Sequence, residues 1–504
     1  MKGMRVLVLG VLAAGVAAAV AFADPGAQTG PSSSESPYVL RTEPGVVTRS
    51  ILTVGDTVNP KPDGTPYRMV GIPDGLGAFD NGDGTFTLLM NHELGNTQGI
   101  VRAHGARGSF VSKWTVEKGS LRVLHGEDQI QELNVWNGST WEVSNTDGAP
   151  TRLNRLCSGD LAPVSAFYNP ASGNGYDGHL YLNGEEGGTQ GRPFGHVVAT
   201  GQSYELTPWL GNIAFENVVA NPGTGGDATV VAATDDGDAA VGNQVYFYRG
   251  TKQSTGNPVQ KAGLVGGHLF GVKVLGIPQS EYQKTDWQVG DELDVQFVDV
   301  TAHAGNAAQL EADSQAGGVT NFQRPEDGAW DPEHPSDFYF VTTSSFGPIP
   351  AENRTGETRL WRVRLADPGD PSAGGSITLL VSGPVGTSGD ANAPGPQMFD
   401  NITVDRGKVI LVEDVGNQPY LGGAWVYSID SGNLTRVARH DPSRFTQGGS
   451  GFLTQDEEMS GIIPAPFLGA GKYLVDVQAH YNITGELVQG GQLLELHVPP
   501  GKFR

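Results

Sequence analysis

The sequence predicts an all-β protein, a six-bladed β-propeller with irregular insertions and a few short helices. Gly and Pro make up about a fifth of the 504 residues, with 73 Gly and 32 Pro and no collagen-like period. This composition favours many short strands joined by tight turns. Long segments with apolar residues at helical spacing are hard to find, and the best helical candidate is the short segment 301–313.

The strands of the predicted blades share a local pattern that occurs six times. Each copy is a turn, a short apolar or aromatic strand and then polar residues, with the strands at residues 85–90, 179–183, 228–233, 338–341, 408–412 and 472–477. The irregular spacing of the copies suits four-stranded blades that carry insertions. Because equivalent strands of a propeller lie radially around a channel, polar groups at the same strand end converge on one axial site.

The N-terminus is typical of an exported protein. Lys2 and Arg5 precede an apolar run, and the small residues of Ala21-Phe22-Ala23 follow it. We therefore predict a signal peptide over residues 1–23, a disordered segment rich in Gly, Ser and Pro over 24–37, and a single β-propeller domain over 38–504. Because Lys2 and Arg5 are not adjacent, we expect a Sec-type signal peptide and a periplasmic or extracellular protein. No later segment approaches ~18 apolar residues, so no membrane span is predicted.

The chain is strongly acidic. It has 55 Asp and Glu against 32 Lys and Arg, which gives a formal net charge of −23 at pH 7. This charge argues against nucleic-acid binding. Solubility in a salty or extracellular medium explains the acidic excess as well as clustered ligands do, and both interpretations stay open. We expect a monomer.

Several acidic residues stand beside strongly apolar or aromatic neighbours, which indicates partial burial. They are Glu93, Glu185, Glu186, Glu216, Glu326, Asp400 and Glu458. Carboxylates brought together without cations repel one another, so a buried group of them implies bound positive charge. Hard oxygen ligands in this number fit Ca²⁺. For any single one of these residues, a solvated surface role is the alternative.

The single cysteine, Cys157, excludes an intramolecular disulfide. It lies in the segment Leu156-Cys-Ser-Gly-Asp160, whose polar residues are unusual neighbours for a core position. A thiolate there would add a ligand for a softer or more highly charged metal. The alternative is a small buried apolar residue.

Arg324 is close in sequence to the predicted ligand Glu326. Its planar guanidinium suits two oxygens of a phosphate, and the alternative is an ion pair with Glu326 or Asp327. His480, which ends the last predicted strand, is interpreted as a satisfied histidine rather than a ligand. The sequence contains no Gly-Xaa-Ser-Xaa-Gly elbow, no His-Glu-Xaa-Xaa-His and no phosphate-binding loop.

Four segments, taken in chain order, resemble the PhoX-type alkaline phosphatase family. They are Cys157 ahead of Glu185-Glu186, Arg324-Pro-Glu326, Asp400-Asn-Ile-Thr-Val-Asp405, and Glu458-Met-Ser-Gly461 followed by Gln478-Ala-His480. The resemblance extends over roughly residues 65–482. It implies a six-bladed propeller in which a cluster of iron and calcium ions hydrolyses phosphate monoesters.

The resemblance also implies roles for individual residues. Cys157 would bind iron, Glu326 and one of Glu185 and Glu186 would hold iron or calcium, and Arg324 would grip the phosphate. The implied cofactors are Fe³⁺ and Ca²⁺, and the implied partners are small-molecule phosphoesters. The family typically carries a twin-arginine signal, which this N-terminus lacks. Looser matches as calcium or iron ligands are Glu93, Glu216, Asp400 and Glu458.

Two other classes of protein remain as alternatives. One is a calcium-dependent lactonase or esterase propeller, and the other is a non-catalytic surface propeller that calcium stabilises. Neither class needs a thiolate. Cys157 therefore favours the phosphatase, and the iron and calcium content of the purified protein would discriminate between the alternatives.

Overall fold

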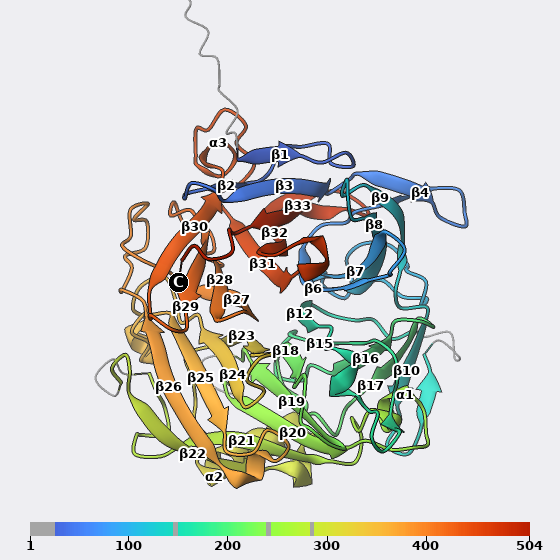
Figure 1. Ribbon diagram of the computed structural model, residues 1–504, viewed down its shortest axis with the longest axis vertical. Coiled ribbons are helices and arrows are strands. Elements are labelled where there is room, and N and C mark those ends of the chain that lie inside the picture. The colour runs from blue at the N-terminus through green and yellow to red at the C-terminus, as the bar shows by residue number, and fades with distance from the viewer. Residues whose placement is uncertain (1–25, 145–149, 238–242, 283–286, 504) are drawn as a thin grey trace, which may run out of the picture.

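The structure, a computed structural model, describes residues 26–144, 150–237, 243–282 and 287–503. These residues form six blades of mainly antiparallel strands around a central channel, with short helices between them (Figure 1). The predicted fold class, a six-bladed β-propeller, is therefore confirmed. In each blade the strand that comes first in the blade's meander lies at the channel, and the next strands lie further out.

Blades 1 to 3 follow one another along the chain. Blade 1 consists of β6 (Pro73–Asp80), β7 (Thr85–His92), β8 (Phe110–Glu117) and β9 (Val123–Asp128). Blade 2 consists of β12 (Leu156–Asp160), β15 (Leu180–Glu185), β16 (Pro193–Val197) and β17 (Gln202–Glu205), extended by β10 (Glu132–Trp136) and β11 (Trp141–Val143). Blade 3 consists of β18 (Phe215–Ala220), β19 (Ala228–Asp235), β20 (Val245–Thr251) and β21 (His268–Val274).

Blades 4 to 6 complete the ring. Blade 4 consists of β23 (Pro325–Trp330), β24 (Asp337–Thr342), β25 (Arg359–Leu365) and β26 (Gly375–Ser382), and β22 (Glu292–Asp299) joins its outer edge to that of blade 3. Blade 5 consists of β27 (Phe399–Asp405), β28 (Lys408–Glu413), β29 (Gly423–Ser428), β30 (Leu434–His440) and β2 (Val39–Arg41). Blade 6 consists of β31 (Glu457–Pro464), β32 (Lys472–Ile483), β33 (Val488–His497), β3 (Val47–Thr53) and β1 (Ala27–Thr29).

The remaining elements of the described chain are short and lie in the connections. Two hairpins pair β4 (Thr57–Pro60) with β5 (Pro66–Arg68) and β13 (Tyr168–Asn169) with β14 (Asn174–Gly175). The α-helices are α1 (Pro258–Lys261), α2 (Ala307–Gly317) and α3 (Pro442–Phe445). The 3₁₀-helical turns are Val164–Ala166, Thr301–His303, Pro350–Glu352, Pro371–Ala373 and Pro466–Leu468.

Strands from both ends of the described chain close the ring. β3, from the N-terminal part, pairs with β33 near the C-terminus, and β2 pairs with β30 of blade 5. The innermost strands contact one another in order from β6 to β31, and β31 in turn contacts β6. The residues at the start of these six strands are therefore arranged around one axis.

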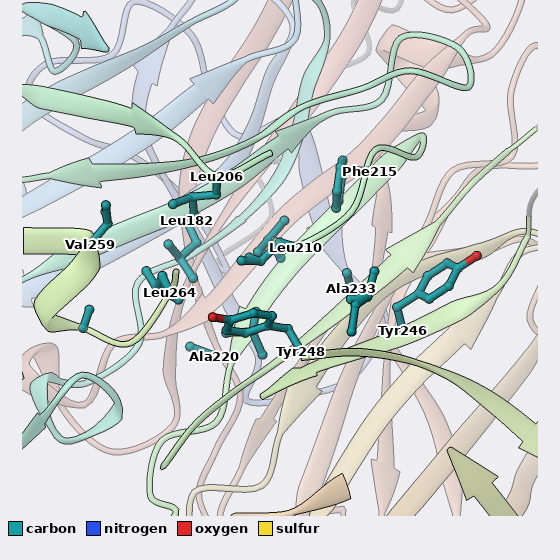
Figure 2. Close-up of a cluster of buried hydrophobic side chains, with 14 of the residues drawn as sticks. Leu182, Leu206, Leu210, Phe215, Ala220, Ala233, Tyr246, Tyr248, Val259 and Leu264 are labelled. Carbon is teal, nitrogen blue, oxygen red and sulfur yellow. The ribbon is translucent and has the colours of Figure 1, made fainter. Parts of the chain in front are cut away.

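Apolar side chains fill the interfaces between successive blades, and the described residues form one such cluster at each interface. Figure 2 shows the cluster between blades 2 and 3, to which Leu182 of β15, Phe215 of β18 and Tyr246 of β20 belong. Full burial of one such side chain contributes about 1.5–3 kcal/mol. Packing between blade faces therefore supplies much of the stability that holds the channel in shape.

All six strands predicted from the sequence are present, and each is the second strand of its blade. β15, β19, β24 and β28 are buried along almost their whole length. A strand buried on both faces has a continuous apolar sequence, which makes it easy to recognise. The predicted helix over residues 301–313 is found in part, as the turn Thr301–His303 followed by α2, which ends where Gly318 adopts a left-handed conformation with φ of 74°.

The N-terminal segment departs from the prediction where the structure describes it. Residues 1–23, the predicted signal peptide, lie outside the described residues. Residues 26–37 were expected to be disordered, but β1 pairs in parallel with β3, and Gly30 donates its N–H to the Ser50 carbonyl at 3.0 Å. The exposed edge of β3 supplies these hydrogen bonds, which Gly, Ser and Pro content alone does not reveal. Within the described ranges, no helix is both long and apolar enough to cross a membrane.

Candidate metal centre

Six buried side chains occupy the same position in six blades. The second residue of every innermost strand is acidic or, in blade 2, cysteine: Asp74, Cys157, Glu216, Glu326, Asp400 and Glu458. We call these six residues the ligand ring. Five of them were predicted as ligands from the sequence, and Asp74 was not.

The backbone is irregular at this position in every blade. The pairing between the innermost and second strands shifts register beside each ring residue, which is a bulge that redirects side chains. In four blades the residue two positions before the ring residue is left-handed, at a cost of roughly 1 kcal/mol for a residue with a Cβ. These residues are Ile72, Arg155, Arg324 and Met398, with φ of 52°, 49°, 60° and 43°.

The donor atoms of the ring lie close enough to share metal ions. Cys157 Sγ is 3.3 Å from Oδ2 of Asp74, and Glu93, which follows β7, lies beside them. In this group all donor atoms lie within 4.8 Å of one another. In a second group, which consists of Glu216, Glu326 and Asp400, the donor atoms also lie within 4.8 Å of one another.

The ring is electrostatically unfavourable without cations. The carboxyl groups of Glu216, Glu326 and Asp400 each have a pKa well above the usual value. The first cause is burial, and the second is the charge of neighbouring carboxylates. Burial and the carboxylates of Asp74 and Glu216 raise the pKa of the Cys157 thiol in the same way. Bound cations would remove this repulsion and favour the charged forms of all these groups.

Polar residues that follow the second strands reach the same end of the channel. Burial and the carboxylates of Glu93 and Asp236, opposed by Arg155, raise the pKa of Glu186 to about 8. Asp414, which follows β28, forms a backbone bridge with Glu458. Burial and then the Glu458 carboxylate raise the pKa of Asp414 to about 7.

His480 lies near the C-terminal end of the blade 6 strand β32. Its Nδ1 lies 2.7 Å from Oε1 of Gln489, and its Nε2 lies 3.6 Å from Oε2 of Glu458. Burial alone lowers the pKa of His480, but these two contacts raise it to about 10. These contacts place the His480 imidazole beside the ring on the blade 6 side.

Two arginines occupy equivalent positions, two residues before the ring residues of blades 2 and 4. Arg324 donates from Nε and Nη2 to Asp236 at 2.9 and 2.6 Å, and its Nη2 is 3.0 Å from Glu326. Arg155 pairs with Glu93 at 2.6 Å and with Glu186. Their side chains remain 30% and 48% exposed, so both are positively charged groups that solvent can reach beside a buried acidic ring.

Glu185, one of the two glutamates predicted as alternatives, is paired with Arg192 beside the ring. Arg192 pairs with both of its oxygens, at 2.7 and 2.8 Å. Its Oε1 also accepts the N–H of Asn154 at 3.0 Å, which fixes the turn that leads into β12. Successive strand residues point to opposite sides, so Glu185 holds the turn while Glu186 lies beside the ring.

The same anchoring contact recurs in two other blades. Glu281 accepts the N–H of Gln323 at 2.7 Å, and Glu413 accepts the N–H of Gln397 at 2.7 Å. Each anchored N–H belongs to the residue three positions before a ring residue. We call Glu185, Glu281 and Glu413 the anchor glutamates.

A layer of hydrogen-bonded side chains crosses the channel next to the ring. Asn401 donates to Ser158 Oγ at 2.6 Å, and Ser158 donates to Glu216 at 2.5 Å. In the same layer Asn217 donates to Asp327 at 2.5 Å.

Two cavities lie on either side of this polar layer. On the side away from the ring, later residues of the innermost strands line a cavity of about 230 Å³. Another cavity, of about 410 Å³, lies on the ring side and is lined by Glu93, Arg155, His480 and Gln489 among others.

Sequence reasoning missed Asp74, Arg155, Asp236 and Asp414. One signal was available for Asp74, because Ile72-Pro-Asp74 repeats the arrangement of Arg324-Pro-Glu326 in another blade. Asp236 and Asp414 follow the predicted strands 228–233 and 408–412, so the polar strand ends were a signal for them, and Arg155 stands before Cys157 as Arg324 stands before Glu326. Whether each predicted residue binds metal stays a prediction.

Comparisons with known proteins identify a family and a shared fold. The family model described as "Alkaline phosphatase PhoX" matches residues 198–469. Among solved structures, the chain is similar to Pseudomonas fluorescens PhoX in complex with vanadate, a transition state analogue, with 12% identity, a TM-score of 0.64, and coverage of 91% of this chain and 96% of that chain. At this identity the likeness shows a shared fold.

Other solved structures are more distant. The GH93 α-L-arabinofuranosidase of Fusarium graminearum, solved with arabinobiose, gives 9% identity and a TM-score of 0.41 over 88% of this chain and 97% of that one. This score is too low to support an argument about function. A search of curated protein sequences finds no match.

Proposed function

Because this chain belongs to the PhoX alkaline phosphatase family, we propose that it is an exported, metal-dependent phosphatase that hydrolyses phosphate monoesters at the ligand ring. One observation carries the proposal beyond family membership. Six buried donors from six blades meet at one end of the channel, with two partly exposed arginines beside them. Buried acids in this number need positive charge, and a phosphate needs positive charge as well.

The residues present fit iron and calcium. Carboxylate oxygens are hard ligands that suit Ca²⁺, and one thiolate among them suits a ferric ion better than calcium. We assign Cys157 to iron, with Asp74 and Glu93 beside it. The second donor group and Glu458 would hold the remaining iron or calcium ions. Of the two predicted candidates at the end of β15, Glu185 and Glu186, we favour Glu186, because Arg192 pairs with Glu185.

Arg324 and Arg155 are the groups that we assign to the phosphate. The guanidinium of Arg324 is held in place by Asp236 and Glu326, so little rotamer freedom is lost when it binds two phosphate oxygens. Arg155 occupies the equivalent position in blade 2 and is the more exposed of the two. Between them they would orient the dianion above the ring.

The chemistry that the ions supply when bound is neutralisation of the phosphate charge and activation of water at neutral pH. The chain's own residues keep these charges desolvated and fixed, which strengthens electrostatic stabilisation of the transition state. The cavity lined by Glu93, Arg155 and His480 is open next to the ring and has room for the alcohol part of a substrate. Export by the predicted signal peptide would place this site outside the cytoplasm.

The test is hydrolysis of a generic phosphate monoester, p-nitrophenyl phosphate, before and after exhaustive chelation. We expect hydrolysis by the metal-loaded protein, loss of activity on chelation, and recovery when calcium and iron are returned together. Asp160→Asn is a control, since Asp160 lines the cavity on the far side of the polar layer. A metal-loaded, folded protein that does not hydrolyse phosphate monoesters would contradict the proposal, as would activity that survives complete chelation.

A further inference from the structure

The cavity of about 410 Å³ on the ring side has a polar lining. Its walls come from neighbouring blades: the loop after β7 in blade 1, Arg155 before β12 in blade 2, and the hairpin of β32 and β33 in blade 6 (Figure 1). Ile72 is the one apolar side chain among the described residues that line it, and Ile72 is itself buried. The cavity therefore offers a bound molecule hydrogen-bonding groups rather than an apolar or aromatic surface.

Residues 95–98, which follow β7, form one fixed wall of this cavity. Gln98 Oε1 accepts the N–H of Gly95 at 2.7 Å, and the N–H of Gln98 donates to the Gly95 carbonyl at 2.9 Å. The N–H of Asn96 donates at 3.1 Å to Oδ1 of Asn154, in the segment that leads into β12. Blade 2 thus holds this loop of blade 1, so little ordering is needed before Thr97 and Gln98 contact a ligand.

The hairpin of β32 and β33 forms the opposite wall and is also fixed. Gln489 Oε1 lies 2.7 Å from Nδ1 of His480. Glu486, which lies between the two strands, pairs with Arg102 at 3.4 Å. Because Arg102 belongs to the same connection between β7 and β8 as Gln98, this ion pair ties the two walls to each other.

Three groups of the lining are available to a bound molecule. Gln98 and Gln489 use their amide oxygens in the contacts above, and among the described residues nothing accepts a hydrogen bond from either NH₂ group. The hydroxyl of Thr97 likewise has no hydrogen-bond partner in the described part of the chain. Two amide donors and a hydroxyl, which can both donate and accept, therefore remain for a ligand.

The cavity lies beside a group that we assign to the phosphate. Arg155 lines it, so the alcohol part of an ester whose phosphate binds Arg155 can lie in this cavity. An alkyl or aryl group there would displace water from the amides and the hydroxyl without offering them a new partner, which is unfavourable. The hydroxyl groups of a polyol would replace that water.

We propose that this cavity holds the alcohol part of the substrate, and that Thr97 and Gln98, with the amide of Gln489, select phosphate monoesters of polyols over those of alkyl alcohols and phenols. Glycerol and sugars are alcohols of this class. The inference rests on the proposed function and deepens it by naming the class of ester. Thr97 and Gln98 would contact the alcohol rather than the reacting phosphate, so they would set specificity.

The test compares two esters of equal chain length, α-glycerophosphate and n-propyl phosphate, which differ only in hydroxyl groups. Thr97→Val and Gln98→Met each remove hydrogen-bonding groups from the cavity. Gln418→Met is the matched control, because Gln418 Oε1 also accepts a backbone N–H, that of Gly389 at 2.9 Å, in the connection after β28 and outside this cavity. The readout is the ratio of the two kcat/KM values, since a general loss of stability or of metal affects both esters equally.

We expect the wild type to favour the glycerol ester by about 10 to 100-fold in kcat/KM, as two hydrogen bonds would give. Thr97→Val and Gln98→Met should each lower this ratio by about 3 to 10-fold, and Gln418→Met should leave it unchanged. A wild-type ratio near unity, or a ratio that neither cavity variant lowers, would overturn the inference while the proposed function stands.

A binding measurement covers the case in which no ester is hydrolysed. Dihydroxybutylphosphonate and butylphosphonate imitate the two esters but carry a C–P bond that resists hydrolysis, and calorimetry gives their affinities for metal-loaded wild type and Thr97→Val. We expect the dihydroxy compound to bind about 10 to 100-fold more tightly to the wild type, and this preference to fall by about 3 to 10-fold in Thr97→Val.

The two measurements separate this inference from the proposed function. A folded, metal-loaded protein that prefers the dihydroxy phosphonate but hydrolyses neither ester would refute the proposed function and leave the selectivity for polyols standing. Equal affinities for the two phosphonates, or no binding of either, would overturn the selectivity.

Discussion

Arg324 and Arg364 make the same two-point contact with an aspartate, but their surroundings differ. Arg364 binds Asp337 at 2.6 Å through both Nε and Nη2, at the opposite end of blade 4 from the ring. Arg324 binds Asp236 in the same manner and also contacts the ring residue Glu326. Comparing the two arginines therefore separates the effect of a two-point arginine–aspartate contact from the effect of its position in blade 4.

Arg324→Lys is expected to keep the fold and the charge but lose the two-point contact with phosphate. We predict a fall in kcat/KM of about 10 to 100-fold on a phosphate monoester and weaker inhibition by inorganic phosphate, because one charge-assisted contact is lost. Arg364→Lys should change neither quantity. Steady-state kinetics of both variants provide the measurement, and wild-type kinetics in Arg324→Lys would remove Arg324 from the site.

Cys157 is the one sulfur-containing residue of the ligand ring. If it binds iron, Cys157→Ala and Cys157→Ser should both lower iron per chain, while calcium is partly retained. Serine keeps the size of the side chain but is a poor soft ligand, so agreement between the two variants excludes a packing effect. Iron content and visible absorption are measured. A core role would instead cost about 1 to 2 kcal/mol for the alanine variant and leave iron unchanged.

The start of the innermost strand is the element that builds the site. In blades 2, 4 and 5 an anchor glutamate accepts the N–H of a residue in the turn before the strand. The residue that follows this N–H donor is left-handed, and the ring residue comes two positions after the left-handed residue. In blade 4 the left-handed residue is Arg324, whereas in blade 5 it is the uncharged Met398. The same anchored turn therefore places a charged side chain beside the ring in blade 4 and an uncharged side chain there in blade 5.

Glu281→Gln tests this device in blade 4. Glu281 also pairs with the buried Arg359, so the variant should lose about 3–5 kcal/mol of stability. At a temperature where it remains folded, we predict weaker phosphate inhibition and a roughly 10 to 100-fold lower kcat/KM, because the turn that carries Arg324 is no longer fixed.

Glu413→Gln is the matched control, because its turn carries Met398. It should lose stability but retain most of its phosphate inhibition. Equal loss of phosphate inhibition in both variants would show that the effect is one of general stability rather than of Arg324.

The strands that were predicted from the sequence are the second strands of the blades, which are less directly involved in chemistry than the innermost strands. The second strands were predicted because they are continuous apolar runs, and their polar ends pointed to Glu93 and Glu186. The innermost strands were not predicted, since they contain bulges and carry a polar residue such as Glu216 or Asp400 in second position. Their register depends on pairing with distant segments, which local patterns do not encode.

At the scale of the whole molecule, the repeated pattern was sufficient to predict six blades. It did not predict that β1, β2 and β3 are distributed over the last two blades, because such pairing joins segments hundreds of residues apart. The acidic excess left solubility and clustered ligands as equal explanations. The structure places a part of that excess in a buried ring, where solubility does not explain it.

The ring should make the metal-free protein sensitive to rising pH. Without cations the folded state raises the pKa of Glu186 from 4.5 to about 8 and raises those of Asp74 and Glu216 as well. Between these values the folded state holds more protons than the unfolded state, so stability falls as pH rises, by about 1.4 kcal/mol per pH unit for each proton of difference.

We therefore predict that the melting temperature of the chelated protein decreases between pH 5 and pH 8, a window that follows from the pKa of Glu186. The metal-loaded protein should show a smaller decrease, because bound cations stabilise the charged carboxylates. Thermal denaturation at a series of pH values with and without chelator provides the measurement. A chelated protein whose stability does not depend on pH across this window would contradict a buried acidic ring.

The iron and calcium content of the purified, folded protein tests the metal-bound ring most directly. Because carboxylates suit calcium and a thiolate suits iron, the proposed function predicts iron and calcium together in every chain. Elemental analysis after extensive dialysis provides the measurement. A folded protein without bound metal would contradict the metal-bound ring, and calcium without iron would contradict the role of Cys157 and favour a calcium-only propeller.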